Sequence, residues 1–423
     1  MKKLFFLYLI FTQLCAIENK NYTVMCYMTS NNDLFAFSEK NIDQMKKIGS
    51  NNNLNILVQQ DVFEKTESKR IFVKKNKLEI IQTLTEKPES ISGTPENLFS
   101  FVKWCIENYP AKKYFLILWD HGSGIIDPNI WKFNHANLYI FNPELGLFEL
   151  NRDEINKRGI CFNEVFDVYL NNQDLKNTLR KISIELLAGK KITLGFDACN
   201  MAMAEIAFQI KDYVDIIIAS QETEPGSGWN YETLLKPLKS KDLTPQEFAK
   251  ATVESYQKYY EKTFADFTLS AVNITEFDLL TKKIDSIAQD LITILNSENK
   301  KIILSELTKI RTSRKYSTIF ANPDYIDLNN FFTSLSDFVK KNINNEKYKI
   351  NKKEFDNLNT NLITATEILN KLVLKKTFCF SLPFADGISI YFPTKKIHNS
   401  YEKTDFATTN KWLDFLKAYV KLR

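Results

Sequence analysis

The chain has 423 residues, of which 44% are apolar and 25% are charged, a composition typical of a globular protein and not of a disordered or fibrous one. It carries 56 basic and 51 acidic residues, and this near balance gives a net charge of only +5. There is no long basic run and no zinc-finger spacing, so we expect no nucleic-acid partner.

The first residues, MKKLFFLYLIFTQLCAIENK, have the pattern of a secretory signal peptide. Lys2 and Lys3 form a basic start, an apolar run follows, and Ala16 offers a small residue before a cleavage site. The run is too short to span a membrane, and no later stretch is long and apolar enough to do so. We expect cleavage after Ala16 and a secreted or periplasmic protein. Cys15 raises the alternative of a lipoprotein, but bulky Leu14 stands where a small residue is expected.

Cysteine usage points to at least one free thiol. The signal peptide holds Cys15, and the mature chain holds an odd number of cysteines without a CxxC pair. These cysteines are Cys26, Cys105, Cys161, Cys199 and Cys379.

Short apolar runs alternate with helical patterns along the first two thirds of the chain. Strands are predicted at residues 22–27, 55–59, 114–119, 191–196, 215–219 and 267–274. Thr94-Pro95 and Thr244-Pro245 each combine an N-cap residue with proline at the first helical position, and predict helices to about Asn108 and Lys262. This alternation predicts an α/β fold with a mostly parallel sheet.

The remaining stretches divide the chain further. Residues 125–172 show little periodicity and are predicted to form a long surface excursion between two core strands. After Ile274 the pattern is mostly helical, with a late strand near 388–392 that is also a candidate to return to the main sheet. We therefore expect a signal peptide at 1–16, a catalytic domain at 17–275 and a mainly helical region at 276–423.

Two reactive residues follow buried strands. His121 comes after YFLILWD, and Cys199 comes after KITLGFDA. Taken singly, each has a simpler reading, as a turn that contains histidine and as a buried structural cysteine. Parallel sheets place active sites at the carboxyl ends of their strands, and a thiol with a pKa of ~8.5 needs a base such as imidazole to become a good nucleophile. Together the two residues predict a thiol–imidazole pair.

The blocks that carry these residues are WDHGSG at 119–124 and FDACNM at 196–201. With the supporting blocks at 31–34, 220–229 and 386–393, they resemble the caspase-like cysteine peptidases, and most of all the clostripain type. The resemblance implies a caspase-like three-layer sandwich and a thioester acyl-enzyme formed by Cys199 with His121 as the proton carrier. It also implies an oxyanion hole from the backbone N–H groups of Gly122 and Cys199. It implies no third member of the catalytic set, and leaves calcium open as a ligand without assigning residues to it.

Specificity is expected to depend on acidic residues near Cys199. Asp197 lies two residues before Cys199, so the two side chains share one face of the strand. A buried carboxylate there would bind Lys or Arg at the residue before the cut, as clostripain-type enzymes prefer. Helix capping by Asp197 is the alternative. Glu222 and Glu224 are further candidates for the pocket, and solvated loop positions are the alternative for them.

The 125–172 excursion also carries candidate sites for self-cleavage. Lys157 and Arg158 are the preferred positions and Arg152 is the alternative, because clostripain-like enzymes are cut within this region. An uncut surface loop is the simpler reading. The sequence thus predicts a secreted cysteine endopeptidase acting on protein or peptide substrates. The alternatives are a catalytically silent caspase-like binding or adhesion protein, and a related hydrolase or transpeptidase of different specificity.

Overall fold

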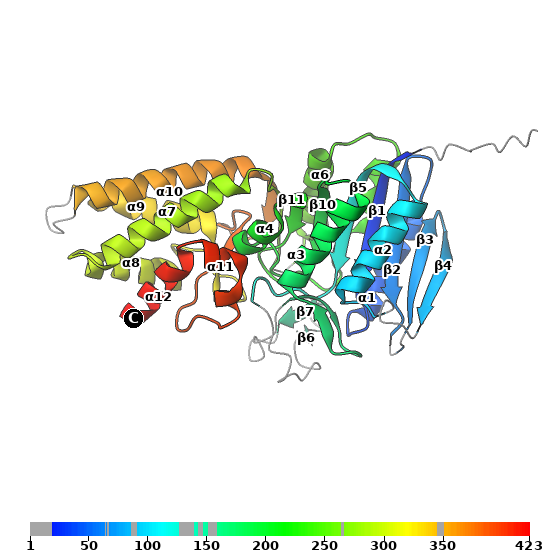
Figure 1. Cartoon of the computed structure of the whole chain (residues 1–423), viewed down its shortest axis with the longest axis horizontal. Helices are drawn as coiled ribbons and strands as arrows, with labels where there is room; N and C mark the ends of the chain where they lie inside the picture. Colours follow the sequence, from blue (N-terminus) through cyan, green and yellow to red (C-terminus); the bar gives the residue numbers. More distant parts are fainter. Residues whose placement is uncertain are drawn as a thin grey trace, which may run out of the picture.

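A nine-stranded sheet forms the centre of the computed structural model, which describes residues 19–63, 65, 67–85, 91–126, 139–142, 147–150, 159–263, 266–344 and 351–423 (Figure 1). The strand order is β14-β12-β11-β10-β5-β1-β2-β3-β4. Its strands are β1 (Lys20–Met28), β2 (Leu54–Asp61), β3 (Glu67–Lys74), β4 (Lys77–Thr85), β5 (Ala111–Trp119), β10 (Ile192–Asp197), β11 (Val214–Ala219), β12 (Thr268–Asn273) and β14 (Val373–Phe378). Strands β2, β1, β5, β10 and β11 are parallel, and the others pair antiparallel at the two edges. This confirms the predicted α/β fold with a mostly parallel central sheet.

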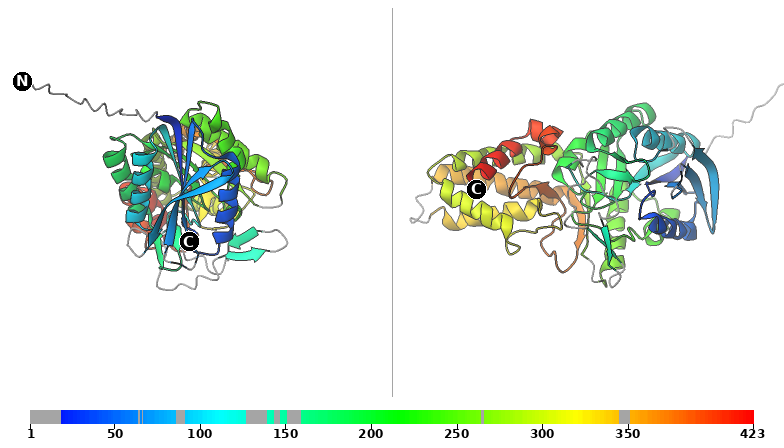
Figure 2. Two further views of the ribbon diagram at one scale, coloured as in Figure 1. Left: turned by 90° about the vertical axis from the view of Figure 1, so that its right-hand side faces the viewer. Right: turned by 90° about the horizontal axis from the view of Figure 1, so that it is seen from below.

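Helices cover both faces of the sheet and complete three layers (Figure 2). On one face α2 (Pro95–Asn108) packs against α3 (Asn172–Lys181), and on the other α5 (Tyr231–Leu235) contacts both α1 (Phe35–Ile48) and α6 (Pro245–Tyr260). Every residue of β2 and β10 is buried, as expected for parallel strands covered on both faces. The predicted caps are present, because the Thr94 side chain accepts a hydrogen bond from Asn97 N and Thr244 forms a capping box with Glu247.

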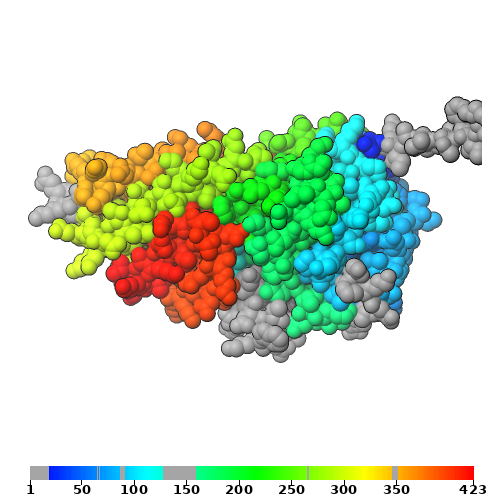
Figure 3. Space-filling model, viewed as in Figure 1, coloured from blue at the N-terminus to red at the C-terminus, as the bar shows by residue number. Residues whose placement is uncertain are grey.

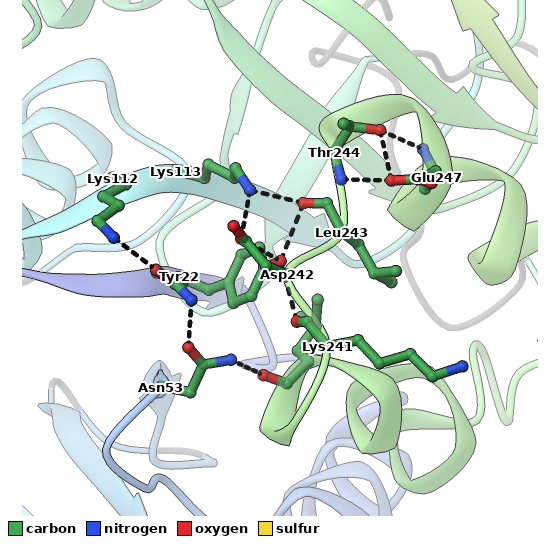
Figure 4. Close-up of polar contacts among 11 residues, drawn as sticks. Tyr22, Asn53, Lys112, Lys113, Lys241, Asp242, Leu243, Thr244 and Glu247 are labelled. Carbon is green, nitrogen blue, oxygen red and sulfur yellow. Dashed lines mark hydrogen bonds and ion pairs between the residues drawn. The ribbon is translucent and has the colours of Figure 1, made fainter.

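The amino ends of β1 and β5 are tied to the loop before α6 by side-chain contacts (Figure 4). The Tyr22 hydroxyl lies 3.1 Å from Asp242 Oδ1 and donates to the Leu243 carbonyl at 2.9 Å. Lys113 Nζ donates to the same Asp242 carboxylate at 2.7 Å. These contacts fix the start of α6 at the edge of the sheet opposite the carboxyl ends of the parallel strands.

The C-terminal part is mainly helical and lies at one end of the molecule, whereas β3 and β4 lie at the other (Figure 1). Its helices are α7 (Phe277–Leu295), α8 (Lys300–Thr312), α9 (Leu328–Asn342), α10 (Lys352–Leu372), α11 (Asp405–Thr409) and α12 (Trp412–Leu422). The segment that includes α11 lies against the α/β part, as the contact of red and green surfaces in Figure 3 shows. There the ring centroids of Phe406 and Phe208 are 5.6 Å apart. Phe208 belongs to α4 (Ala204–Ile210).

Two of the three strands described after residue 320, β14 (Val373–Phe378) and β15 (Ser389–Tyr391), connect the helical part with the α/β part. β14 continues directly from α10 and joins the edge of the main sheet beside β12. The predicted late strand is β15 (Ser389–Tyr391), and it pairs instead with β13 (Tyr325–Asp327) in a separate two-stranded sheet. It lies close to the end of β10, since Ser389 N donates to the Ala202 carbonyl at 2.8 Å. The helical region therefore contributes one strand to the central sheet.

The long excursion after β5 contains regular structure in its described parts. Strands β6 (Tyr139–Asn142) and β7 (Leu147–Leu150) form one hairpin, and β8 (Ile160–Asn163) and β9 (Val168–Leu170) form another. β8 is buried and forms a bridge between Ile160 and Gly122. The excursion therefore returns to the carboxyl edge of the sheet, close to His121.

Candidate active site

His121 and Cys199 lie together because the strands that precede them are neighbours. Asp197 at the end of β10 pairs with Trp119 at the end of β5, and each reactive residue follows two positions later. Both line one cleft at the carboxyl edge of the sheet, together with Asp197 and Glu224. The remaining lining residues are Leu34, Trp119, Asp120, Ala198, Pro225, Gly226 and Gly228.

The segments that carry the two reactive residues touch each other through Gly122. A Cβ at this position would lie 2.6 Å from the Cys199 carbonyl oxygen and 2.9 Å from the Ala198 Cβ. Both distances are too short for any side chain, so only glycine permits this approach of the loop after β5 to the end of β10. The backbone of Gly122 consequently lies beside that of Cys199, as an oxyanion hole formed by these residues requires.

The imidazole of His121 is buried and contacts an acidic residue that the sequence did not predict as part of the site. Its Nε2 lies 2.7 Å from Asp33 Oδ1. Burial lowers the pKa of His121, but the charge of Asp33 and the hydrogen bond to it outweigh burial and raise that pKa above its usual value. The pKa of Asp33 is lowered in turn, because the His121 contact outweighs partial burial. The pair therefore favours a protonated imidazole.

Asn32 holds the loop that presents Asp33. Its Nδ2 donates to Asp120 Oδ1 at 2.7 Å and to the Phe162 carbonyl at 2.9 Å, while its Oδ1 accepts from Leu34 N at 3.0 Å. Asp120 also accepts a hydrogen bond from Phe162 N, and burial raises its pKa well above the usual value. The block at 31–34, which supported the family resemblance, thus joins the loops after β1 and β5 to β8.

Cys199 is buried, and its Sγ accepts a hydrogen bond from Glu224 N at 3.2 Å. The following helix begins only at Ala204, because Met203 forms a bridge with Ser389 and Asn200 has a φ of 60°. The short loop from 199 to 203 leaves the thiol at the rim of the sheet.

No disulfide joins any of the five cysteines in the described residues, so the Cys199 sulfur is held as a thiol. Burial raises the pKa of Cys26, Cys105 and Cys161, which makes them poor nucleophiles.

The Asp197 carboxylate faces the loop after β11. It accepts hydrogen bonds from Trp229 N at 3.1 and 3.2 Å and from the Tyr231 hydroxyl at 2.7 Å, and burial raises its pKa to about 6. It does not cap the next helix, whose N-cap is Met203. Gly228 lies directly on it, with a φ of +59° and a Cβ position only 2.8 Å from Asp197 Oδ1.

The two glutamates proposed for the pocket occupy different positions. Glu224 lines the cleft, and neither of its buried carboxylate oxygens has a hydrogen-bond partner in the described part of the chain. Burial and the neighbouring Asp197 raise the pKa of Glu224 well above its usual value. Glu222 is not among the residues lining the cleft. Its carboxylate accepts from Thr223 N at 2.7 Å and from Ala321 N at 2.8 Å, and so supports the loop before β13.

Several sequence predictions lie outside the described residues. These are the signal peptide at 1–16 and the cleavage candidates Arg152, Lys157 and Arg158. Within the described ranges, no group of three or more His, Cys, Asp or Glu side chains could hold a metal ion. No helix there is both long and apolar enough to cross a membrane.

Comparison with known proteins identifies the family of the chain. Residues 26–419 match the clostripain family, Peptidase C11. Clostripain from Hathewaya histolytica is 26% identical over an alignment 448 residues long, which covers 92% of this chain and 78% of that protein.

Solved structures share the fold. The secreted C11 cysteine protease of Bacteroides thetaiotaomicron called iotapain superimposes with a TM-score of 0.63 at 16% identity, over 92% of this chain and 99% of that one. An inactive zymogen C11 protease from Parabacteroides distasonis gives a TM-score of 0.58 at 16% identity, over 94% and 98% of the two chains.

Proposed function

Because the chain belongs to the clostripain family of cysteine peptidases, we propose that it is an endopeptidase that cleaves after Lys or Arg with Cys199 and His121 as its catalytic dyad. The observation that carries the proposal is the shared cleft, in which a thiol, an imidazole and a buried carboxylate converge. The thiol and the imidazole supply the chemistry of amide hydrolysis, and the carboxylate supplies the selectivity.

The reaction begins with attack of the Cys199 thiolate on the scissile carbonyl carbon. Negative charge then develops on the carbonyl oxygen, and the N–H groups of Gly122 and Cys199 stabilise it, each contributing about 3 kcal/mol. His121 donates a proton to the leaving amine, which departs and leaves a thioester on Cys199. A water molecule then attacks the thioester, with His121 accepting its proton, and the acid product leaves.

Asp33 determines which ring nitrogen of His121 acts in this scheme. Its carboxylate engages Nε2, so the proton that reaches the leaving amine is assigned to Nδ1. An imidazolium held by a carboxylate also stabilises the Cys199 thiolate beside it. Asp33 is therefore a positioning residue, since it acts on the substrate only through His121. None of these steps requires a metal ion.

Asp197 is proposed as the group that recognises the basic side chain before the cut. It shares the cleft with Cys199, and its fixed hydrogen bonds to Trp229 N and the Tyr231 hydroxyl hold it in one orientation. Glu224 lies beside it, and both of its carboxylate oxygens are buried without a hydrogen-bond partner in the described residues. A guanidinium or ammonium group would satisfy both carboxylates. Glu222 bonds elsewhere and takes a structural role in this proposal.

Export and self-cleavage complete the proposal. The signal-peptide pattern at 1–16 supports secretion, and the related B. thetaiotaomicron protease is secreted. Cleavage after Lys157 or Arg158, with Arg152 as the alternative, would divide the chain between His121 and Cys199. Mass spectrometry of the purified protein tests this, because wild type should give two fragments and the Cys199→Ala protein one intact chain. An intact and fully active wild type would exclude self-cleavage.

One assay tests the proposed function. Fluorogenic peptides that end in Arg, Lys, Asp or Asn are incubated with wild type, Cys199→Ala and the matched control Cys105→Ala, since Cys105 lies on α2 and does not line the cleft. Wild type and the control should cleave the Arg and Lys peptides only, and Cys199→Ala should cleave none. Equal activity of Cys199→Ala would refute the dyad, and preferential cleavage after Asp or Asn would refute the proposed pocket.

A further inference from the structure

Three phenylalanines in one seven-residue segment are exposed at the end of β14. The exposed fractions of these residues are 39% for Phe378, 99% for Phe380 and 50% for Phe384. A single exposed apolar residue is ordinary on a protein surface, but a group of large aromatic residues commonly marks a binding surface. We call this segment, residues 378–384, the phenylalanine loop.

The backbone of the phenylalanine loop is firmly held, so the exposure of its rings is not a consequence of a loose chain. Cys379 N donates to the Phe267 carbonyl at 3.0 Å, and Leu382 N donates to the Cys379 carbonyl at 3.1 Å. Cys379 and Leu382 are themselves buried, and the Ser381 hydroxyl donates to Asp266. Cys379 and Leu382 face inward and anchor the loop, and the phenylalanines are left facing solvent.

The loop lies at the same edge of the sheet as the reactive cysteine. β14 is antiparallel to β12, which is antiparallel to β11, so the carboxyl ends of β14, β11 and β10 meet at one edge. A chain of contacts links the residues after β10 to the end of β14 and places them at the same level along the strand direction. Asn200 N donates to the Glu222 carbonyl at 3.1 Å, Glu222 N donates to Thr268 Oγ1 at 3.0 Å, and Thr268 pairs with Phe378.

The chemistry of the proposed function gives the substrate a direction across this edge. His121 follows β5 and must protonate the leaving amine, so the residues after the cut depart on the β5 side of Cys199. The acyl portion remains on Cys199 and extends the opposite way, past β11 and β12 toward β14. The phenylalanine loop therefore lies on the path of the residues that precede the cut.

The distance from β10 to β14 determines which substrate residues reach the phenylalanine loop. Three strand spacings separate β10 from β14, or about 14 Å at ~4.8 Å each. An extended peptide advances about 3.3 Å per residue, so about four residues cover that distance.

We propose that the phenylalanine loop is an apolar substrate subsite that binds hydrophobic side chains three to five residues before the cut. The inference rests on the proposed function, because it takes the position of the acyl group and the direction of the leaving amine from it. It assigns to this chain a preference for protein segments in which apolar residues precede the Lys or Arg by this interval.

Matched peptides test the proposal on the full-length enzyme. Two have the sequence acetyl-X-X-X-Ala-Arg with a C-terminal fluorophore, where X is Leu or Ser, and a third is the short acetyl-Ala-Arg. The variants are Phe380→Ser and the control Ile80→Ser, since Ile80 is 53% exposed on β4 at the opposite edge of the sheet. Wild type and Ile80→Ser should favour the Leu peptide over the Ser peptide about tenfold in kcat/KM. Phe380→Ser should lose most of that preference and cleave the short peptide normally.

Three results would overturn the proposal. The first is equal kcat/KM of wild type for the Leu and Ser peptides, and the second is retention of the full preference in Phe380→Ser. The third is a change in sedimentation or vesicle binding of Phe380→Ser with unchanged kinetics, which would assign the loop to self-association or to lipid instead. A wild type that cleaves none of the three peptides would refute the proposed function itself, and this inference with it.

Discussion

Replacing Asp33 with asparagine tests how His121 is held in its working state. The substitution keeps the size of the side chain and removes its negative charge, while Nε2 of His121 keeps a hydrogen-bonding neighbour. A hydrogen bond to a charged group contributes about 1.5–3 kcal/mol, which corresponds to roughly a 10- to 150-fold loss if the charged pair acts in the transition state. We expect Asp33→Asn to lower kcat by this factor and to change KM little, because Asp33 lies outside the set of residues that line the cleft.

The pH profile separates this role from a structural one. Asp33 raises the pKa of His121, so its removal lowers that pKa. The reaction needs a protonated imidazole for the leaving amine, and the alkaline limb of the kcat/KM profile should therefore move to lower pH in Asp33→Asn. The measurement is kcat/KM for an Arg peptide between about pH 5 and 9, with Asp43→Asn on the exposed face of α1 as the control. An unchanged profile and unchanged kcat would refute the reasoning.

Three further predictions concern the pocket and the fold. Asp197→Asn should lower kcat/KM for Arg and Lys peptides by orders of magnitude, since breaking a buried charged contact costs about 2–5 kcal/mol; unchanged rates would move the pocket to Glu224. Asp197 has a pKa of about 6, so it should gain a proton as the pH falls from 8 to 5. The wild-type KM for Arg peptides should therefore rise over that range. A constant KM would contradict the proposal that ionised Asp197 binds the substrate. Gly228→Ala places a Cβ 2.8 Å from Asp197 Oδ1 at a φ of +59°. It should therefore raise KM and lower Tm in a thermal melt. Wild-type values of both would show that the loop adjusts freely.

The sequence predicted the parts of the fold that are buried on both faces. The strands predicted at 114–119 and 191–196 are mostly apolar, and the observed strands β5 and β10 end at Trp119 and Asp197, which the sheet aligns. That alignment is what brings His121 and Cys199 together. The helix starts at Thr94 and Thr244 were predictable because capping is a local interaction.

The sequence did not predict β3, β4 and β14, because edge strands carry mixed and charged side chains. β3 and β4 form a hairpin whose turn includes Asn76 at a φ of 60°, and β4 is largely exposed. β14, with the sequence VLKKTF, follows α10 without an intervening loop and has no clear alternation. The return of the chain to the main sheet was therefore expected only at the more apolar segment near 388–392.

In the site too, local sequence patterns were predictive, whereas contacts between residues distant in sequence were not. Asp33 reaches His121 only because Asn32 bonds to Asp120, 88 positions away in sequence, and no local pattern encodes that contact. Glu222 and Glu224 have the same chemistry and lie two positions apart, yet the loop conformation turns one to Ala321 and the other into the cleft. Such choices depend on loop geometry that periodicity does not specify.

Covalent labelling shows whether Cys199, activated by His121, is the nucleophile. The purified protein is treated with a peptidyl-arginine chloromethyl ketone, and the adduct is located by peptide mass mapping. We expect one adduct per chain, on Cys199, formed far more slowly in His121→Ala and absent from Cys199→Ala. Labelling of another cysteine, or an adduct in Cys199→Ala at the wild-type rate, would contradict it.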